Sequence, residues 1–188
     1  MNDNNISRSI YAQKVELLLR LIPIIMEEEV FAIHGGTAIN LFLKDLPRYS
    51  VDIDLTYIPL ADRAKSIEDI SLHLESIKEK AEQAFKGMHI VPNYTTSKLL
   101  CEYHGRQVKI EVNQTKRGIV GGNVLTLPLS DRAQQEFSLY CEAKIVPLTL
   151  LYGGKIAAAL SRQHPRDLFD VKYMELPLDE CREGLLFC

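Results

Sequence analysis

Apolar side chains recur along the chain with two different periods, and these periods predict its helices and strands. Between residues 62 and 86 they return at three- and four-residue steps, which places them on one stripe of a helix. Residues 51–58, VDIDLTYI, alternate at every second position instead, as a strand with one buried face does. Helical periodicity also predicts helices over residues 8–29, 37–46, 147–162 and from 165 onward, the first being bent or ended by Pro23.

Short β-rich runs lie between these helices. A strand is expected at residues 30–34, closed by Gly35-Gly36, and a hairpin over residues 98–114 that turns at His104-Gly105. A glycine-bearing loop follows at residues 115–124, and a further strand at 124–129. This order predicts an α/β (α+β) fold in which helices flank a small mixed β-sheet.

The expected division of the chain is a core domain over residues 1–145 and a C-terminal helical segment over residues 146–188. The stretch PLDECREGLLFC shows no clear final element, so we expect the helical segment to stop short of a complete second domain.

Composition indicates the class of protein and the compartment in which it folds. The chain has 188 residues, 46% hydrophobic and 25% charged, which suits one folded domain with its own core. The four cysteines are far apart and form no CxxC pair, which favours a reducing cytoplasm over a disulfide framework. No segment has the length and apolarity of a membrane span, and we expect no membrane partner.

Two aspartates are the first candidate functional residues. Asp52 and Asp54 share the polar face of the strand at residues 51–58, and two like charges so close are unfavourable without a cation between them. Carboxylate oxygens are the ligands of a hard divalent cation such as Mg²⁺, or of Mn²⁺. Glu111, on the polar face of another predicted strand, is the candidate third ligand or the general base.

A glycine turn before a helix supplies a site for phosphate. Gly35 and Gly36 let backbone approach a phosphate closely, and a helix that starts at Thr37 offers free N–H groups and one hydroxyl. The glycine turn and the aspartates together predict a metal-bound nucleoside triphosphate (NTP).

The order of these parts resembles the DNA-polymerase-β-like nucleotidyltransferase superfamily, and within it the AbiEii/AbiGii-type toxins. The segments that carry the resemblance are HGGTAINLF, RYSVDIDL, VKIEVN and KIAAALSRQHPRDLFDV, and they span residues 30–175. The resemblance implies a nucleotidyltransferase fold and the toxin of a type IV toxin–antitoxin system that acts in phage defence, with a separately encoded antitoxin.

Site residues follow from the resemblance position by position. It implies metal binding by Asp52, Asp54 and Glu111, and catalysis by these three together with Lys155. The nucleotide-binding residues that it implies are Gly35, Gly36, Thr37, Arg48, Ser50, Lys155, Arg166, Asp167 and Asp170.

One departure concerns the helix that carries Lys155. Gly153-Gly154 precede this lysine where helix formers are expected, and each glycine costs about 1 kcal/mol in a helix interior. We therefore expect the helix to be locally loose.

The function expected from these residues is transfer of NMP from an NTP to an acceptor hydroxyl, with RNA, and in particular a tRNA 3′ end, as the acceptor that the resemblance implies. Two alternatives stay open: transfer to a small-molecule or protein hydroxyl, and nucleotide binding without turnover. Ordinary structural roles also stay open, namely a solvated strand face for the aspartates and Glu111, a surface position for Lys155, and a helix-start ion pair for Arg166 and Asp167.

Overall fold

A seven-stranded mixed sheet forms the centre of the molecule in a computed structural model that describes residues 3–188, with side chains from residue 10 onward. Its strands are β1 (Phe31–His34), β2 (Asp52–Tyr57), β3 (His89–Asn93), β4 (Lys98–Tyr103), β5 (Arg106–Val112), β6 (Leu125–Pro128) and β7 (Glu142–Ile145). They lie in the order β3-β4-β5-β2-β1-β7-β6. The pairs β1–β7 and β2–β5 are parallel and the others antiparallel, which confirms the mixed α/β sheet.

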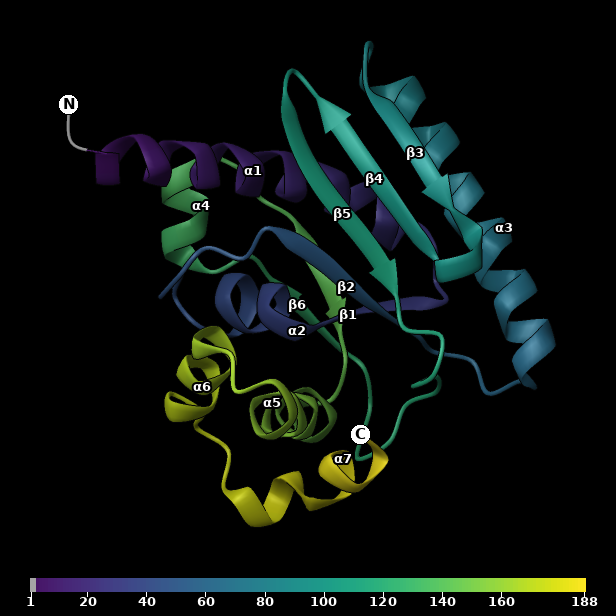
Figure 1. The fold of residues 1–188 in the computed structure, drawn as a ribbon, viewed down its shortest axis with the longest axis vertical. Coiled ribbons are helices and arrows are strands. Elements are labelled where there is room, and N and C mark those ends of the chain that lie inside the picture. The colour runs from purple at the N-terminus through teal and green to yellow at the C-terminus, as the bar shows by residue number, and fades with distance from the viewer. Residues whose placement is uncertain (1–2) are drawn as a thin grey trace.

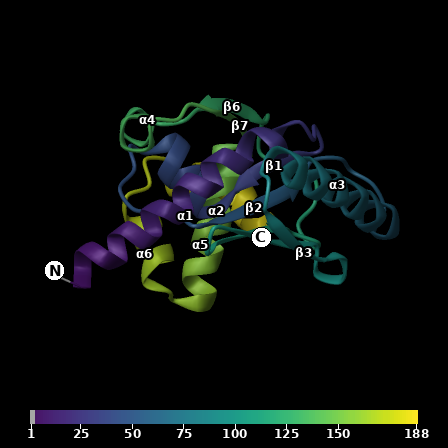
Figure 2. The same ribbon diagram turned by 90° about the horizontal axis from the view of Figure 1, so that it is seen from above.

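Helices gather around this sheet. They are α1 (Asp3–Met26), α2 (Gly35–Thr37) with a π-helical continuation (Ala38–Leu43), α3 (Arg63–Ala84), α4 (Asp131–Phe137), α5 (Leu148–Arg162), α6 (Pro165–Lys172) and α7 (Arg182–Phe187). Two short 3₁₀ helices complete them, at Tyr94–Thr96 and Leu178–Cys181. Figure 1 shows α5, α6 and α7 grouped together beyond the ends of the central strands. Figure 2 places α3 and β3 at one end of the molecule and α4 at the other.

The strand and helix periods predict most of these elements, and the exceptions have local causes. The helix expected at Thr37 begins two residues earlier, at Gly35, directly after β1. The first helix runs past Pro23 and ends at Met26. Several elements were missed, among them β3, α4, β7 and α7. Only Ile90 is buried in β3, an edge strand that also tolerates Pro92, and β7 has four residues, so neither shows a clear alternation.

The C-terminal segment is more ordered than its sequence suggests. The chain continues after α6 into a 3₁₀ helix and α7, and α7 packs on α5. Leu150, Leu151 and Cys181 belong to the same buried cluster as the strand residues Ile53 and Ile110. The division at residue 145 stays a prediction, but the two parts share one hydrophobic core.

Glu28 connects the end of α1 to α3 through a buried polar network. Its carboxylate accepts hydrogen bonds from Ser76 and Lys80, each at 2.7 Å, and lies 2.6 Å from Nδ1 of His73. Burial alone would raise the pKa of Glu28, but the hydrogen bonds from Lys80, Ser76 and His73 outweigh it and lower the pKa to about 2. The ionised carboxylate therefore stabilises the contact between the two helices.

This network predicts a pH-dependent contribution to stability. A carboxyl group with a depressed folded-state pKa stabilises the protein above its ordinary value of 4.5, and the contribution fades as pH falls from 4.5 toward about 2. We expect Glu28→Gln to lower the free energy of unfolding by about 2–3 kcal/mol at pH 7 and by less at pH 3. Urea unfolding at both pH values measures this. Glu29→Gln, at an exposed position, is the control, and an equal loss for Glu28→Gln at both pH values would contradict the assignment.

Candidate active site

Parallel pairing of β2 with β5 brings the three predicted acidic residues together. Asp54 lies opposite Glu111 in the register, and Asp52 lies opposite Lys109. Ile53, Leu55, Ile110 and Val112 alternate with them and are buried in the core. Because side chains alternate across a strand, burial of these four fixes the charged residues on the opposite face.

Lysines neutralise Glu111 in this arrangement. Its two carboxylate oxygens lie 3.1 Å from Nζ of Lys98 and 2.9 Å from Nζ of Lys109. Burial raises the pKa of Glu111, but the hydrogen bonds from Lys109 and Lys98 outweigh it, and the net direction is down. Asp54 shifts the other way, because burial and the nearby charges of Asp52 and Glu111 raise its pKa against the attraction of Lys109 and Lys155.

Asp52 and Asp54 are the side chains of this site that suit a divalent cation. Within the part of the chain that is described, no three His, Cys, Asp or Glu side chains lie as a closed metal-binding group. The reason is local, since Glu111 faces Lys98 and Lys109. Mg²⁺ commonly takes only one or two carboxylates and completes its shell with water and substrate phosphate, so the Asp52–Asp54 pair fits such an ion. Glu111 can coordinate the cation only if its carboxylate gives up its ion pairs with Lys98 and Lys109.

The glycine turn packs against this acidic face. Gly35 has a φ of +71°, and a Cβ added to it would lie 2.5 Å from Oδ2 of Asp54. A Cβ on Gly36 would lie 2.9 Å from both the Arg48 guanidinium and Oγ of Ser50. The positive φ of Gly35 therefore needs glycine, and at Gly36 the absence of a side chain lets Arg48 and Ser50 come close to the backbone.

Thr37 connects the glycine turn to the start of β2. It is fully buried, and its hydroxyl donates a hydrogen bond of 2.6 Å to the backbone carbonyl of Asp52. It lines neither of the cavities described below. The hydroxyl is used by the start of β2 and fixes the position of Asp52. A role for Thr37 at the phosphates stays a prediction.

A buried ion network connects α6 to the rest of the site. Asp170 accepts hydrogen bonds from Arg48 at 2.9 and 2.5 Å and lies 2.9 Å from Nζ of Lys155. Lys155 also contacts Asp167 at 3.0 Å, and Asp167 in turn pairs with Arg162. Burial alone would raise the pKa of Asp170, but Arg48 and Lys155 lower it overall. Lys155 is thus no surface lysine, and the ion-pair partners of Asp167 are Lys155 and Arg162 rather than Arg166.

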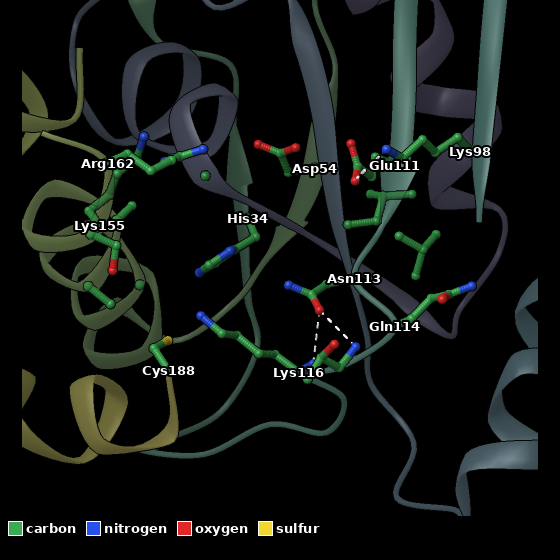
Figure 3. Close-up of a pocket in the computed structure, with 18 of the residues that line it drawn as sticks. His34, Asp54, Lys98, Glu111, Asn113, Gln114, Lys116, Lys155, Arg162 and Cys188 are labelled. Carbon is green, nitrogen blue, oxygen red and sulfur yellow. Dashed lines mark hydrogen bonds and ion pairs between the residues drawn. The ribbon is translucent and has the colours of Figure 1, made fainter. Parts of the chain in front are cut away.

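Two adjoining cavities open onto these residues. The smaller, about 290 Å³, is lined by Gly36, Arg48, Ser50, Asp52, Asp54, Lys109, Glu111, Lys155, Arg162, His164, Arg166 and Asp167. The larger, about 560 Å³, extends from Gly35 and Asp54 past His34 and Asn113 to Cys188 (Figure 3). Asp54, Glu111, Lys155 and Arg162 line both, so they stand where the cavities meet. Asp170 lines neither and acts on the site through Arg48 and Lys155.

Arg162 and His34 are among the contributors to this site that sequence reasoning missed. Arg162 follows Lys155 by seven residues, two helical turns, and this spacing on α5 is the signal that could have found it. His34 lines the larger cavity, and its Nε2 lies 3.4 Å from the carbonyl of Leu150. Burial lowers the pKa of His34 to about 4, so its ring is neutral near pH 7.

Residues 16–180 match the family described as "Nucleotidyl transferase AbiEii toxin, Type IV TA system". The chain belongs to the AbiEii nucleotidyltransferase toxin family. Comparison with curated proteins gives no match. Among solved structures, this AbiEii-family chain is similar to "MenT4, nucleotidyltransferase toxin Rv2826c from Mycobacterium tuberculosis H37Rv", with a TM-score of 0.65 and 14% identity. The match covers 92% of this chain and 62% of that one, so this chain spans less than two thirds of its structural neighbour.

The family and the structural neighbour confirm the expected resemblance and the nucleotidyltransferase fold. Nucleotidyltransferases as a class use an NTP and divalent metal ions. Within the described residues, no helix combines the length and apolarity needed to cross a bilayer.

Proposed function

We propose that this AbiEii-family chain transfers NMP from an NTP to an acceptor hydroxyl, with a divalent cation, Mg²⁺ or Mn²⁺, held by Asp52 and Asp54. The observation that supports this most directly is the parallel β2–β5 register, which sets Asp54 beside Glu111 at the junction of two cavities. A cation bound there would supply positive charge to the triphosphate and lower the pKa of the acceptor hydroxyl.

The smaller cavity suits the triphosphate. Five cationic side chains line it, those of Arg48, Lys109, Lys155, Arg162 and Arg166. Such charges are useful where negative charge develops on a transferring phosphoryl group. Asp167 and Asp170 hold Lys155 in place before the nucleotide arrives. Gly36 and Ser50 bring backbone and a hydroxyl to the same cavity.

In the reaction, the acceptor oxygen bonds to the α-phosphorus and the hydroxyl proton passes to solvent water, while the bond from the α-phosphorus to the bridging oxygen of the β-phosphate breaks and pyrophosphate leaves. The pKa of Glu111, held down by Lys109 and Lys98, suits a residue that orients the acceptor better than one that accepts its proton. An RNA acceptor, tRNA in particular, agrees with Lys116 in the lining of the larger cavity, where a phosphate backbone could be neutralised. A separately encoded antitoxin is the protein partner that we propose.

The test of this function is transfer of label from each α-³²P NTP to total bacterial tRNA in the presence of Mg²⁺. We expect labelled tRNA with the wild type and background label with Asp52→Ala/Asp54→Ala, because the variant has lost both carboxylates that would bind the metal. Circular dichroism of the variant checks that it is folded. If the folded wild type labels no tRNA with any NTP, this acceptor is excluded, and if the variant labels tRNA as well as the wild type, the metal site is wrong.

A further inference from the structure

The larger cavity has the composition of a nucleoside site. Ala157 and Ala158 from α5 form an apolar part of its wall. Amide and hydroxyl groups, among them those of Asn113 and Thr115, line it together with charged side chains such as Lys116. Small-molecule sites combine an apolar wall with a few fixed polar groups in this way. The cavity also meets the acidic residues at Asp54 and Glu111, where the α-phosphate would lie under the proposed function.

One polar group in this cavity has a fixed orientation. Oδ1 of Asn113 accepts hydrogen bonds from the backbone N–H groups of Thr115 and Lys116, both at 2.9 Å. Only the oxygen of a carboxamide can accept from an N–H group, so these two bonds decide which end of the side chain is the nitrogen. Figure 3 shows that nitrogen pointing into the cavity, toward the side where His34 lies. Within the described part of the chain, no hydrogen bond is made by Nδ2 of Asn113.

Neighbouring amides differ from Asn113 in this respect. Nε2 of Gln114 is used within the protein, because it donates to the carbonyl of Thr95 at 3.0 Å and to Oγ of Ser97 at 2.8 Å. Asn113 therefore presents an anchored donor that is free for a ligand, while Gln114 stabilises the loop.

We propose that the larger cavity binds the nucleoside part of the NTP and that Asn113 determines its specificity by donating a hydrogen bond from Nδ2 to an oxygen of the base or the ribose. This inference rests on the proposed function and adds to it the recognition of the nucleoside. The N–H donor of Asn113 can pair only with a hydrogen-bond acceptor. It therefore favours a nucleotide that has an oxygen at the position it faces over a nucleotide that lacks this oxygen. Adenine has no carbonyl oxygen, and a 2′-deoxyribose has no 2′-oxygen.

The test is isothermal titration of the four NTPs and their 2′-deoxy forms, each with Mg²⁺, into the wild type and Asn113→Asp. The carboxylate of the variant can still accept from Thr115 and Lys116, so the loop is kept while the donor becomes an acceptor. We expect nucleotides that carry the recognised oxygen to lose about tenfold more affinity than those that lack it. If Asn113→Asp weakens binding of the other NTPs but not of ATP, the recognised oxygen is a base carbonyl. If it weakens binding of the NTPs but not of their 2′-deoxy forms, the recognised oxygen is the 2′-oxygen of the ribose.

The matched control is Asn93→Asp. Oδ1 of Asn93 likewise accepts from a backbone N–H, that of Thr96 at 3.1 Å, but Asn93 lines neither cavity. We expect its affinities to equal those of the wild type. A uniform loss for all nucleotides with Asn113→Asp would report only the added charge and would overturn the inference. If the wild type binds no NTP, the proposed function fails as well; if it binds and Asn113→Asp discriminates unchanged, only the inference fails.

A measurement on the unaltered protein complements the variant. In ¹⁵N-labelled wild type, the side-chain NH₂ signals of Asn113 should shift on addition of the best-bound NTP, and those of Asn93 should not. Unmoved Asn113 signals at saturating nucleotide would overturn the inference even if Asn113→Asp did not fold.

Discussion

Asp170→Asn is expected to lower the free energy of unfolding by about 3–5 kcal/mol and to abolish nucleotidyl transfer. The side chain of Asp170 is fully buried and contacts two cations, Arg48 at 2.5 Å and Lys155 at 2.9 Å. A neutral amide cannot balance either charge, and removal of one partner from a buried ion pair leaves an uncompensated charge. In Asp170→Asn, Lys155 still pairs with Asp167, whereas Arg48 loses its ion pair with Asp170.

The variant should also displace the residues that we propose for the triphosphate. Arg48 and Lys155 both line the smaller cavity, although Asp170 does not. Asp170 is therefore a positioning residue, and its loss should weaken NTP binding in a sample that is still folded at low temperature. Calorimetric titration with Mg·NTP below the unfolding transition separates this effect from the loss of stability.

Two further measurements decide whether the ion network is the cause. Asp179→Asn, at an exposed position in a 3₁₀ helix, is the control and should change stability by less than about 0.5 kcal/mol. Because the folded-state pKa of Asp170 is lowered, its contribution is present above its ordinary value of 3.8 and is lost as pH falls through the folded value. The gap between wild type and Asp170→Asn should therefore shrink below pH 3.8. A gap that stays constant there would mean that packing, not charge, explains the loss.

Some features of the candidate site could be predicted from the sequence, and others depend on tertiary packing. Alternation in VDIDLTYI is a local property, so it correctly placed Asp52 and Asp54 on one face of a strand. Their position beside Glu111 depends on pairing between β2 and β5, which are separated by α3 and two other strands. Such pairing is decided by tertiary packing. The polar face of a predicted strand made Glu111 a candidate, but it did not indicate that this strand pairs with β2.

Partners of charged side chains were the least predictable feature. The lysines that neutralise Glu111 come from its own strand and from its neighbour β4, so their role follows from the hairpin register. Asp170 looks like an ordinary helix residue in the sequence, and only the packing of α6 shows it to be the partner of Arg48. The sequence predicts a hydroxyl at the start of a helix for Thr37, but it does not show that this hydroxyl donates to the carbonyl of Asp52 at the start of β2.

The glycines of α5 were correctly noted as unusual, but the expected consequence was wrong. The helix is unbroken from Leu148 to Arg162. A Cβ on Gly153 would lie 2.8 Å from the Cα of Gly184 and would overlap its carbonyl carbon. A Cβ on Gly154 would lie 2.7 Å from Cε1 of His34. The two glycines let α5 approach α7 on one side and His34 on the other, so close packing offsets their low helix propensity.

Gly153→Ala is therefore expected to destabilise the protein by about 3 kcal/mol or more, because the added methyl meets the backbone of α7. The direction of this change in stability is the informative result. In an exposed helix interior the same substitution would stabilise by about 1 kcal/mol, since alanine is the better helix former. No flexible side chain can move aside at Gly153, where the neighbouring atoms are the main chain of Gly184 and Leu185. Thermal and urea unfolding of the variant measure the effect.

Ser161→Ala, at an exposed position later in α5, is the matched control and should change stability by less than about 0.5 kcal/mol. A second arm uses Gly184→Ala on the opposite helix, whose Cβ would overlap the main chain of Thr149. The two glycine variants act on one crossing, so the loss in the double variant should be well below the sum of the single losses. Stabilisation by Gly153→Ala would mean that α7 does not lie against α5 in solution. The larger cavity would then lose the wall that Cys188, next to the end of α7, contributes to it.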